Sequence, residues 1–547
     1  MKPPKISREA WLLAAMTLLA IAFKGFLLWQ RSAYIDPDEG YYLLLARNVV
    51  TGHGYTLNGL PNIIFPPLLP LLISLFYLVF HNLQLSLGFI TAVSGGLLGI
   101  VVYKICRVRF SPRDSLAGAF LGLFIFHLNA LIPLNRPYVF TLYRGSDIFN
   151  VLLVCTVLLL AIRLVQTTRL RYALGTGVVC ALAYLTRPEG FLLWLAVIAG
   201  LILMVSVRMI RLPVKLILAP VVAFLICSAP YMVYLKSVTG HWMLSGKVAA
   251  GQDYRQALLQ VIKRGDWRDF NKVHYALDAA RLEMNDQYFG YHPAGLGNDR
   301  EASPALKNVW ENLSLYPVVP RTLFSYPLVL LFAIGFVGGI LEIVKRRSAP
   351  DAILALAFLY SLALAALSYP MPRHHLFLVP IFCVYSLWGI KLLLSLFMKK
   401  LSPTISVAVV LAVVVFSFAT DYIRDFDDAA VTSAAFHRGR QVDEAVSAYL
   451  KARGARVLMS MQPGFAVRAF SDWQVLPSTD FTTLMAFAKK KKVDYVIWPD
   501  QWTYHFRVIE MSGSVLPSPG QPKFHFRTVE ARDGFDLIRL TGAADGD

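Results

Sequence analysis

Charged residues and cysteines are both scarce in this chain. Asp, Glu, Lys and Arg make up 16% of the 547 residues, whereas hydrophobic residues make up 56%. So small a charged fraction excludes an ordinary water-soluble globular protein. The five cysteines all lie in apolar segments, which predicts buried structural thiols. No small-residue cleavage site follows the first apolar run, 11–30, so this run is predicted to be a retained helix and not a removed signal peptide.

Long apolar runs are abundant between residues 11 and 419, and they predict a polytopic α-helical membrane protein. A helix needs about 20 apolar residues to cross a bilayer. Eleven segments have roughly that length: 10–30, 86–106, 115–133, 147–165, 171–186, 190–207, 213–235, 321–343, 351–369, 374–397 and 403–420. The mean hydropathy of +0.54 agrees with this fold class.

The net charge of +19 is concentrated at one side of these predicted spans. Six segments together hold 19 basic and 4 acidic residues: 1–10, 104–114, 163–171, 208–215, 342–351 and 391–400. Because Lys and Arg are enriched in cytoplasmic loops, these segments and the N-terminus are predicted to be cytoplasmic. The loops 31–85 and 237–318 and the tail 421–547 then lie on the outer face. The high pI therefore reflects membrane topology, and a nucleic-acid partner is not expected.

The apolar segment 65–80 is too short for an ordinary span. If it crossed the membrane, the basic segment that follows would be placed outside, against the charge rule. A re-entrant or interfacial helix on the outer face is therefore predicted. The outer loop 31–85 is then large, and long ordered loops are often functional.

The tail is predicted to be a separate extracytoplasmic α/β domain, following a transmembrane domain at 1–420. Hydrophobicity falls after residue 420, and short strand-like runs appear with a helix among them. The predicted strands are 457–461, 493–498, 524–529 and 535–540, and the helix is 482–491. About 120 residues are enough for a domain with its own core.

Three carboxylates occur within four positions directly after the first span, at Asp36, Asp38 and Glu39. Acids at the end of a membrane helix are costly unless they face water or a ligand. Asp38 and Glu39 also suit the first turn of an amphipathic helix in which Tyr42 shares a face with later apolar residues. These two roles are compatible, so we expect an active-site acid on a helix that starts here.

Other polar residues lie at helix ends that the charge rule places on the same outer face. They are Asn135, Arg136, Arg144, Asp147, Arg187, Glu189, Arg373, His374 and His375. Arg forks suit phosphate oxygens, and a carboxylate beside bound phosphate can take a proton from an incoming hydroxyl. This combination near lipid headgroups indicates a lipid-phosphate substrate.

Structural alternatives exist for several of these residues. Arg187 and Glu189 could pair with each other, and Asp147 could cap a helix, since Asp is favoured there. His374 and His375 at an interface are more often hydrogen-bonded or headgroup-facing than metal ligands. For each of these residues, a structural role and a role in substrate binding or catalysis both stay open at this point.

An ordered series of motifs in the first outer loop resembles that of the GT-C membrane glycosyltransferases. The series runs from the Asp38-Glu39 pair through Tyr-x3-Ala-Arg-Asn-x3-Gly (42–52), Leu-Asn-Gly-x-Pro (57–61) and Pro-Pro-Leu-Leu (66–69). Within that group it is similar to the protein O-mannosyltransferases and the bacterial aminoarabinose lipid A transferases. The sequence Leu-Thr-Arg-Pro-Glu-Gly (185–190) resembles a motif of the same branch, and a large outer loop after the seventh helix is also shared.

The resemblance implies an inverting transfer from a sugar linked to polyprenyl phosphate. It implies that Asp38 is the general base, with Asp147 as a second acid. Arg187 and Arg373 would hold the donor phosphate, and Lys247 and Arg144 are further candidates. Glu189, His374, His375 and Tyr42 are candidate substrate-binding residues. Asp36 precedes the usual acid pair and could share or take the role of base. Some relatives bind a divalent metal ion near this acid, so the resemblance leaves open whether this protein binds one.

Two other classes of function compete with a glycosyltransferase that acts on a lipid, glycan or protein acceptor. A polyprenyl-lipid transporter or flippase would place charge near the midplane and show repeated halves, whereas these acids lie in an outer loop and no repeat is visible. A non-catalytic cell-envelope assembly protein would not need acids and arginines from four helix ends. The cysteine-free outer loop and tail favour a bacterial inner membrane.

Overall fold

The chain divides into two compact units in a computed structural model. Unit 1 contains residues 1–29, 87–233 and 300–430, and unit 2 contains 30–86, 234–299 and 431–547. The structure describes residues 7–30, 35, 37–57, 60–128, 145–246, 309–310, 312–314, 316–317, 326–367, 372–397, 412, 441–460, 463–475, 481–499, 506–512, 514, 525–532 and 535–541.

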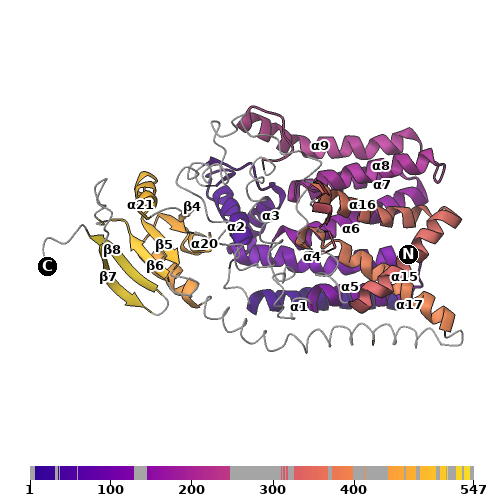
Figure 1. The fold of residues 1–547 in the computed structure, drawn as a ribbon, viewed down its shortest axis with the longest axis horizontal. Coiled ribbons are helices and arrows are strands. Elements are labelled where there is room, and N and C mark those ends of the chain that lie inside the picture. The colour runs from indigo at the N-terminus through magenta and orange to yellow at the C-terminus, as the bar shows by residue number, and fades with distance from the viewer. Residues whose placement is uncertain are drawn as a thin grey trace, which may run out of the picture. The chain divides into compact units, whose positions relative to one another are not determined.

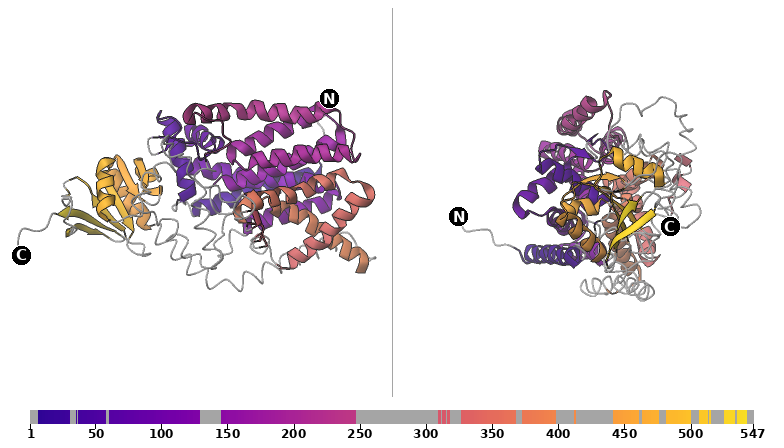
Figure 2. Two further views of the ribbon diagram at one scale, coloured as in Figure 1. Left: turned by 45° about the horizontal axis from the view of Figure 1, so that its top comes forward. Right: turned by 90° about the vertical axis from the view of Figure 1, so that its left-hand side faces the viewer.

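Unit 1 is built from long apolar helices, most of which run lengthwise in Figure 1. The helices are α1 (Arg8–Gln30), α4 (Leu83–Cys106), α5 (Pro112–Leu128), α6 (Ser146–Thr167), α7 (Leu170–Thr186), α8 (Gly190–Ser206), α9 (Val214–Thr239), α15 (Tyr326–Arg346), α16 (Ala349–Leu367) and α17 (Leu378–Phe397). Helices α15 and α17 are inclined to the others. The right-hand view of Figure 2 looks along the lengthwise direction. Six of the described helices, α1, α4, α6, α9, α16 and α17, are long and apolar enough to cross a membrane.

These helices fall on the first ten predicted spans, and the eleventh, 403–420, lies outside the described residues apart from residue 412. Most boundaries differ from the prediction by a few residues, and at one of them a separate element intervenes. The span expected at 374 begins at Leu378, because residues Pro372–His375 form a short 3-10 helix, η4. His374 and His375 therefore precede the apolar helix α17.

The helices α15 and α17 approach each other through two glycines. A Cβ atom added at Gly335 would overlap the carbonyl oxygen of Tyr385, and one at Gly389 would overlap that of Leu331. In membranes, small residues let helix backbones come this close, and the contact gains dispersion energy along both helices. The two glycines thus set the separation of α15 and α17.

We expect Gly335→Ala to destabilise the protein by about 1–3 kcal/mol, because the added methyl group meets backbone and forces the two helices apart. Gly88→Ala in α4 is the matched control, since a Cβ there would have no neighbour within 4 Å. Thermal unfolding of both variants in the same detergent measures the difference. Equal unfolding temperatures would contradict the close packing of α15 and α17.

The first-loop part of unit 2 contains a short helix pair and a small hairpin. Helix α2 (Pro37–Val50) is followed by β1 (Thr56–Leu57), β2 (Leu60–Pro61) and α3 (Leu68–Phe80). The Ser74 hydroxyl of α3 donates to the Ala46 carbonyl of α2 at 3.1 Å, which joins the two helices. At 13 residues α3 is shorter than a span, as expected for the segment 65–80, and its membrane location stays a prediction.

The tail part of unit 2 contains a six-stranded mixed sheet. The strands are β3 (Val457–Ser460), β4 (Asp472–Val475), β5 (Tyr495–Pro499), β6 (Phe506–Glu510), β7 (His525–Arg532) and β8 (Phe535–Thr541), in the order β4-β3-β5-β6-β8-β7. Strand β3 is parallel to both β4 and β5, and helix α20 (Gly464–Ala469) connects β3 to β4. Helix α21 (Phe481–Lys490) packs on the sheet through Leu484, Met485 and Ala488. An α/β arrangement at the C-terminal end is thus confirmed.

Candidate functional site

Helix α2 places the predicted acid pair in its first turn. Pro37 is the first residue of the helix, where its fixed φ is favourable and its missing N–H costs nothing. Asp38 and Glu39 follow, and carboxylates near a helix N-terminus are stabilised by the helix dipole. The Glu39 side chain is buried. The side chain of Asp38 and the whole of Asp36 lie outside what the structure describes.

The aromatic residues after the acids hold α2 against the loop that follows it. Tyr41 and Tyr42 both lie against Phe65, with ring centroids 5.3 and 5.4 Å apart. Tyr42, a candidate substrate-binding residue, is buried in this contact. Its ring therefore contributes to the packing that orients α2.

Three of the candidate residues in unit 1 meet in one buried cluster, the Arg187 cluster (Asp147, Arg187 and Glu189). Arg187 immediately follows α7, Asp147 lies in the first turn of α6, and Glu189 immediately precedes α8. The Arg187 guanidinium forms an ion pair with Asp147, and its Nε lies 3.6 Å from the Glu189 carboxylate. All three side chains are 13% exposed or less. Helix ends far apart in the sequence thus bring an arginine and two acids together.

The turn that carries Arg187 and Glu189 depends on Gly190. A Cβ atom at this position would overlap the backbone of Ala183 and Tyr184 in the preceding helix. The Gly190 N–H also donates to the Arg187 carbonyl at 2.9 Å. Glycine therefore lets α7 and α8 join tightly enough to keep Arg187 and Glu189 beside each other.

His375 belongs to a second polar group in unit 1. Its Nδ1 lies 2.8 Å from the Ser361 hydroxyl, which in turn lies 2.8 Å from the Tyr316 hydroxyl. The imidazole is fully buried, and its Nε2 has no hydrogen-bond partner among the described residues. Burial, and then the positive charge of Arg187, lower the pKa of His375 to about 4. The imidazole is therefore neutral at pH 7, with one nitrogen fixed and the other available.

This depressed pKa predicts a loss of stability in acid. The unfolded imidazole titrates near about 6.5, so acidification towards pH 4 protonates the unfolded chain before the folded one. The stability that neutral His375 contributes is present above pH 6.5 and declines by at most about 3 kcal/mol as the pH falls to 4. Unfolding temperatures measured between pH 7 and pH 5 should fall less in His375→Gln than in the natural chain. An identical decline in both would contradict the assignment.

Several predicted site residues cannot be placed. Arg144 and Lys247 lie outside the described residues, as do Asn135 and Arg136, and only the backbone of Arg373 is described, in η4. His374 is partly buried in the same turn. Within the described residues, no group of three or more His, Cys, Asp or Glu is arranged to hold a metal ion.

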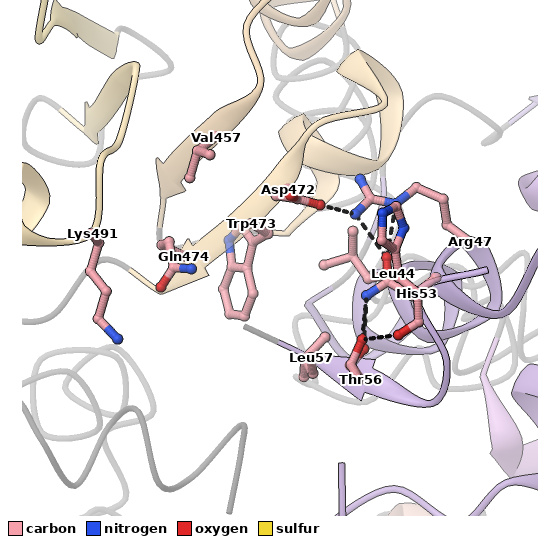
Figure 3. Close-up of a pocket in the computed structure, with 11 residues that line it drawn as sticks. Leu44, Arg47, His53, Thr56, Leu57, Val457, Asp472, Trp473, Gln474 and Lys491 are labelled. Atoms are coloured by element: carbon pink, nitrogen blue, oxygen red, sulfur yellow. Dashed lines mark hydrogen bonds and ion pairs between the residues drawn. The ribbon is translucent and has the colours of Figure 1, made fainter. Parts of the chain in front are cut away.

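One part of unit 2 was not singled out from the sequence. Arg47 of α2 donates to the Asp472 carboxylate (Figure 3) and to the Ser471 carbonyl. The ring centroids of Tyr41 and Trp473 lie 5.4 Å apart. A pocket of about 160 Å³ adjoins these contacts. It is lined by Leu44, Arg47, Asn48, His53, Thr56, Leu57, Val457, Asp472, Trp473, Gln474 and Lys491. Arg47, Asn48 and Leu57 belong to the motif series of the first loop, but the sequence did not indicate that they meet the tail.

Comparison with known proteins identifies the architecture. The family described as dolichyl-phosphate-mannose-protein mannosyltransferase matches residues 65–234. The crystal structure of the transferase ArnT from Cupriavidus metallidurans bound to undecaprenyl phosphate is 13% identical, with a TM-score of 0.54 over 98% of this chain and 99% of that one. The chain has the GT-C fold. No curated protein sequence matches it.

A second solved protein shares this fold. It is the oligosaccharyltransferase AglB from Archaeoglobus fulgidus, solved with an inhibitory peptide and a dolichol-phosphate (14% identity, TM-score 0.55, 89% of this chain and 69% of that one). The same enzyme in a complex with Zn and sulfate is 15% identical, with a TM-score of 0.55 over 89% of this chain and 67% of that one.

These findings confirm the predicted resemblance, the fold class and the multi-pass membrane character. The family match together with the fold bears out the prediction of a glycosyltransferase. Its donor, its acceptor and the face of the membrane on which it acts are matters of proposal.

Proposed function

We propose that this protein is an inverting glycosyltransferase that moves a sugar from a polyprenyl-phosphate donor to an acceptor on the outer face of a bacterial inner membrane. The observation that carries the proposal is the Arg187 cluster, which gathers the ends of three helices around one buried guanidinium. Asp38, in the loop helix α2, supplies the carboxylate that takes a proton from the acceptor. The acceptor is a lipid, a glycan or a protein.

The chemistry needs a base for the acceptor and positive charge for the leaving group. The acceptor hydroxyl loses its proton to Asp38 as its oxygen forms a bond with the anomeric carbon. The bond from that carbon to the phosphate oxygen breaks on the opposite side, which inverts the configuration. Polyprenyl phosphate leaves as an anion, so it needs charge neutralisation more than a proton.

The Arg187 cluster cannot supply this neutralisation alone. One guanidinium faces two carboxylates, so the cluster has a formal net charge of −1 when all three groups are ionised. A phosphate anion would be repelled unless further cations join it. We propose that Arg144, Lys247 and Arg373 provide them, and that neutral His375 offers its Nε2 to the donor without adding charge.

The proposal is tested by incubating the purified protein with a panel of labelled polyprenyl-phosphate sugars and candidate acceptors. We expect one donor to be consumed, with release of polyprenyl phosphate and inversion at the anomeric carbon. Retention of configuration would overturn the direct-displacement mechanism. If no donor is consumed while labelled lipid moves between the leaflets of a vesicle, the protein is a flippase instead.

A further inference from the structure

The tail contacts helix α2 close to its start. A Cβ atom added at Gly40 would overlap Cγ of Pro463 and lie 3.0 Å from its Cβ. Just before the helix, Ile35 is buried, and a Cβ added at Gly464 would lie 3.2 Å from the Ile35 Cβ. Pro463 and Gly464, at the start of α20, therefore pack closely against the start of α2, two residues after Asp38.

A second contact holds the other end of α2. The Arg47 side chain is 4% exposed and uses three of its nitrogens as donors. They donate to the Asp472 carboxylate (Figure 3), to the Ser471 carbonyl and to the Asn48 amide oxygen. A buried guanidinium is tolerated only when its N–H groups are satisfied in this way. Desolvation lowers the pKa of Arg47, and the Asp472 charge opposes that shift.

The two bonds from Arg47 to the tail differ in importance. Asp472 is 65% exposed, so water screens its ion pair with Arg47, which lies at 3.0 Å. The Ser471 carbonyl bond is buried, and leaving such a donor unpaired carries the full desolvation cost. The planar guanidinium of Arg47 bonds the Ser471 carbonyl and the Asp472 carboxylate at once, and it thus fixes the position of the tail against α2.

Trp473 adds a third contact, next to the first one near the start of α2. Its side chain is buried, its indole N–H donates to the Ser460 carbonyl at 3.2 Å, and its ring lies 5.4 Å from that of Tyr41. The hydrogen bond fixes the indole to strand β3. The ring therefore presents a rigid face to α2, which is held near its start at Gly40 and Tyr41 and near its end at Arg47.

We propose that the tail domain positions α2, and through it the acid in its first turn, so that Gly40 and Arg47 are positioning residues for sugar transfer. This rests on the proposed function, in which Asp38 is the base. Arg47 lies nine residues after Asp38, about 14 Å along the helix. A tilt of the helix of a few degrees would then move the acid by about 1 Å, and such a displacement can lower a rate by about 100-fold.

The first test replaces Arg47 by lysine, which keeps the charge and loses the fork. We expect kcat to fall by about 10- to 100-fold with the donor KM within about twofold of the natural value. Arg539→Lys is the matched control, because Arg539 also forms an ion pair in the tail, with Glu510 at 2.7 Å. This control is expected to leave kcat unchanged.

The second test uses the close contact between Gly40 and the Pro463 ring instead of a charge. Gly40→Ala raises helix propensity, yet its methyl group would push α2 away from Pro463. We expect a fall in kcat similar to that of Arg47→Lys, and partial recovery in the double variant with Pro463→Ala, which removes the overlapping Cγ. Gly25→Ala in α1, where a Cβ would have no neighbour within 4 Å, is expected to retain full activity.

A double-mutant cycle separates positioning from general damage. If Arg47 acts through Asp38, Arg47→Lys should not lower further the residual rate of the Asp38→Asn variant. A further fall by the same factor as in the natural chain would overturn the proposal, as would an unchanged kcat in both Arg47→Lys and Gly40→Ala. An Asp38→Asn variant that retains full activity would instead refute the assigned base, so the two failures are distinguishable.

Discussion

Replacing Asp38 by asparagine is expected to lower kcat by about 100- to 10,000-fold, while the donor still binds. The acceptor hydroxyl must lose a proton as it attacks the anomeric carbon, and a carboxamide of the same shape cannot accept it. Asp38 lies in the first turn of α2, and Asp and Asn have similar helix propensities, so the substitution should leave the helix intact. Initial rates under saturating donor measure the effect directly.

Asp36→Asn is the comparison variant, because Asp36 was the alternative base. A small effect there, together with a large one at Asp38, assigns the proton transfer to Asp38. Equal turnover of the natural chain and Asp38→Asn would move the base to Asp36 or Asp147. The binding of donor to each variant, measured separately, shows whether a slow variant has lost chemistry or substrate.

The fold was largely predictable because the strongest sequence signals are local. Apolar runs located the helices of unit 1, and α6 (Ser146–Thr167) differs from the predicted span 147–165 by two residues or fewer. The boundary of α17 was misplaced because apolar character alone does not show that Pro372–His375 forms a separate turn.

The tail shows the limit of local reasoning. Strands β3, β5, β7 and β8 were expected from their β-branched and aromatic residues, whereas β4 and β6 were not. Strand β4 reads Asp-Trp-Gln-Val, which lacks a clear strand pattern. It is a strand because it pairs in parallel with β3 at the edge of the sheet, and such a long-range pairing leaves no periodic signal.

In the candidate site, too, one part could be predicted from the sequence and another could not. The residue types at helix ends suggested that Arg187, Asp147 and Glu189 share one surface, and the structure places them in one cluster. The attachment of Arg47 to Ser471, 424 residues later, could not be deduced from one sequence. The residue types around Arg47 and Ser471 do not indicate this contact, because Arg47 bonds a backbone carbonyl, which every residue has.

Replacing Arg187 by lysine is expected to have the second largest effect, on both stability and donor binding. Arg187 compensates two buried carboxylates, and removing such a partner typically costs about 3–5 kcal/mol because a buried charge is left unpaired. Lysine keeps the charge, so a smaller loss is expected. If Arg187 also contacts the donor phosphate, the loss of its fork should lower kcat/KM by about 100-fold.

Inhibition by free polyprenyl phosphate separates the two roles, because this molecule is the leaving group. Replacing a residue that binds the phosphate should raise the inhibition constant of polyprenyl phosphate. Replacing a purely structural residue should lower only the unfolding temperature. Arg109→Lys is the matched control: Arg109 lies 2.7 Å from Asp351 in another ion pair of unit 1 and should affect stability alone.

Neutralising one acid of the cluster should have the opposite effect. Glu189→Gln changes the formal net charge of the Arg187 cluster from −1 to 0, which removes repulsion from an incoming phosphate. Polyprenyl phosphate should then inhibit at a lower concentration than in the natural chain, while Arg187→Lys requires a higher one. Shifts of the same sign in both variants would show that the cluster acts on the fold and not on the donor phosphate.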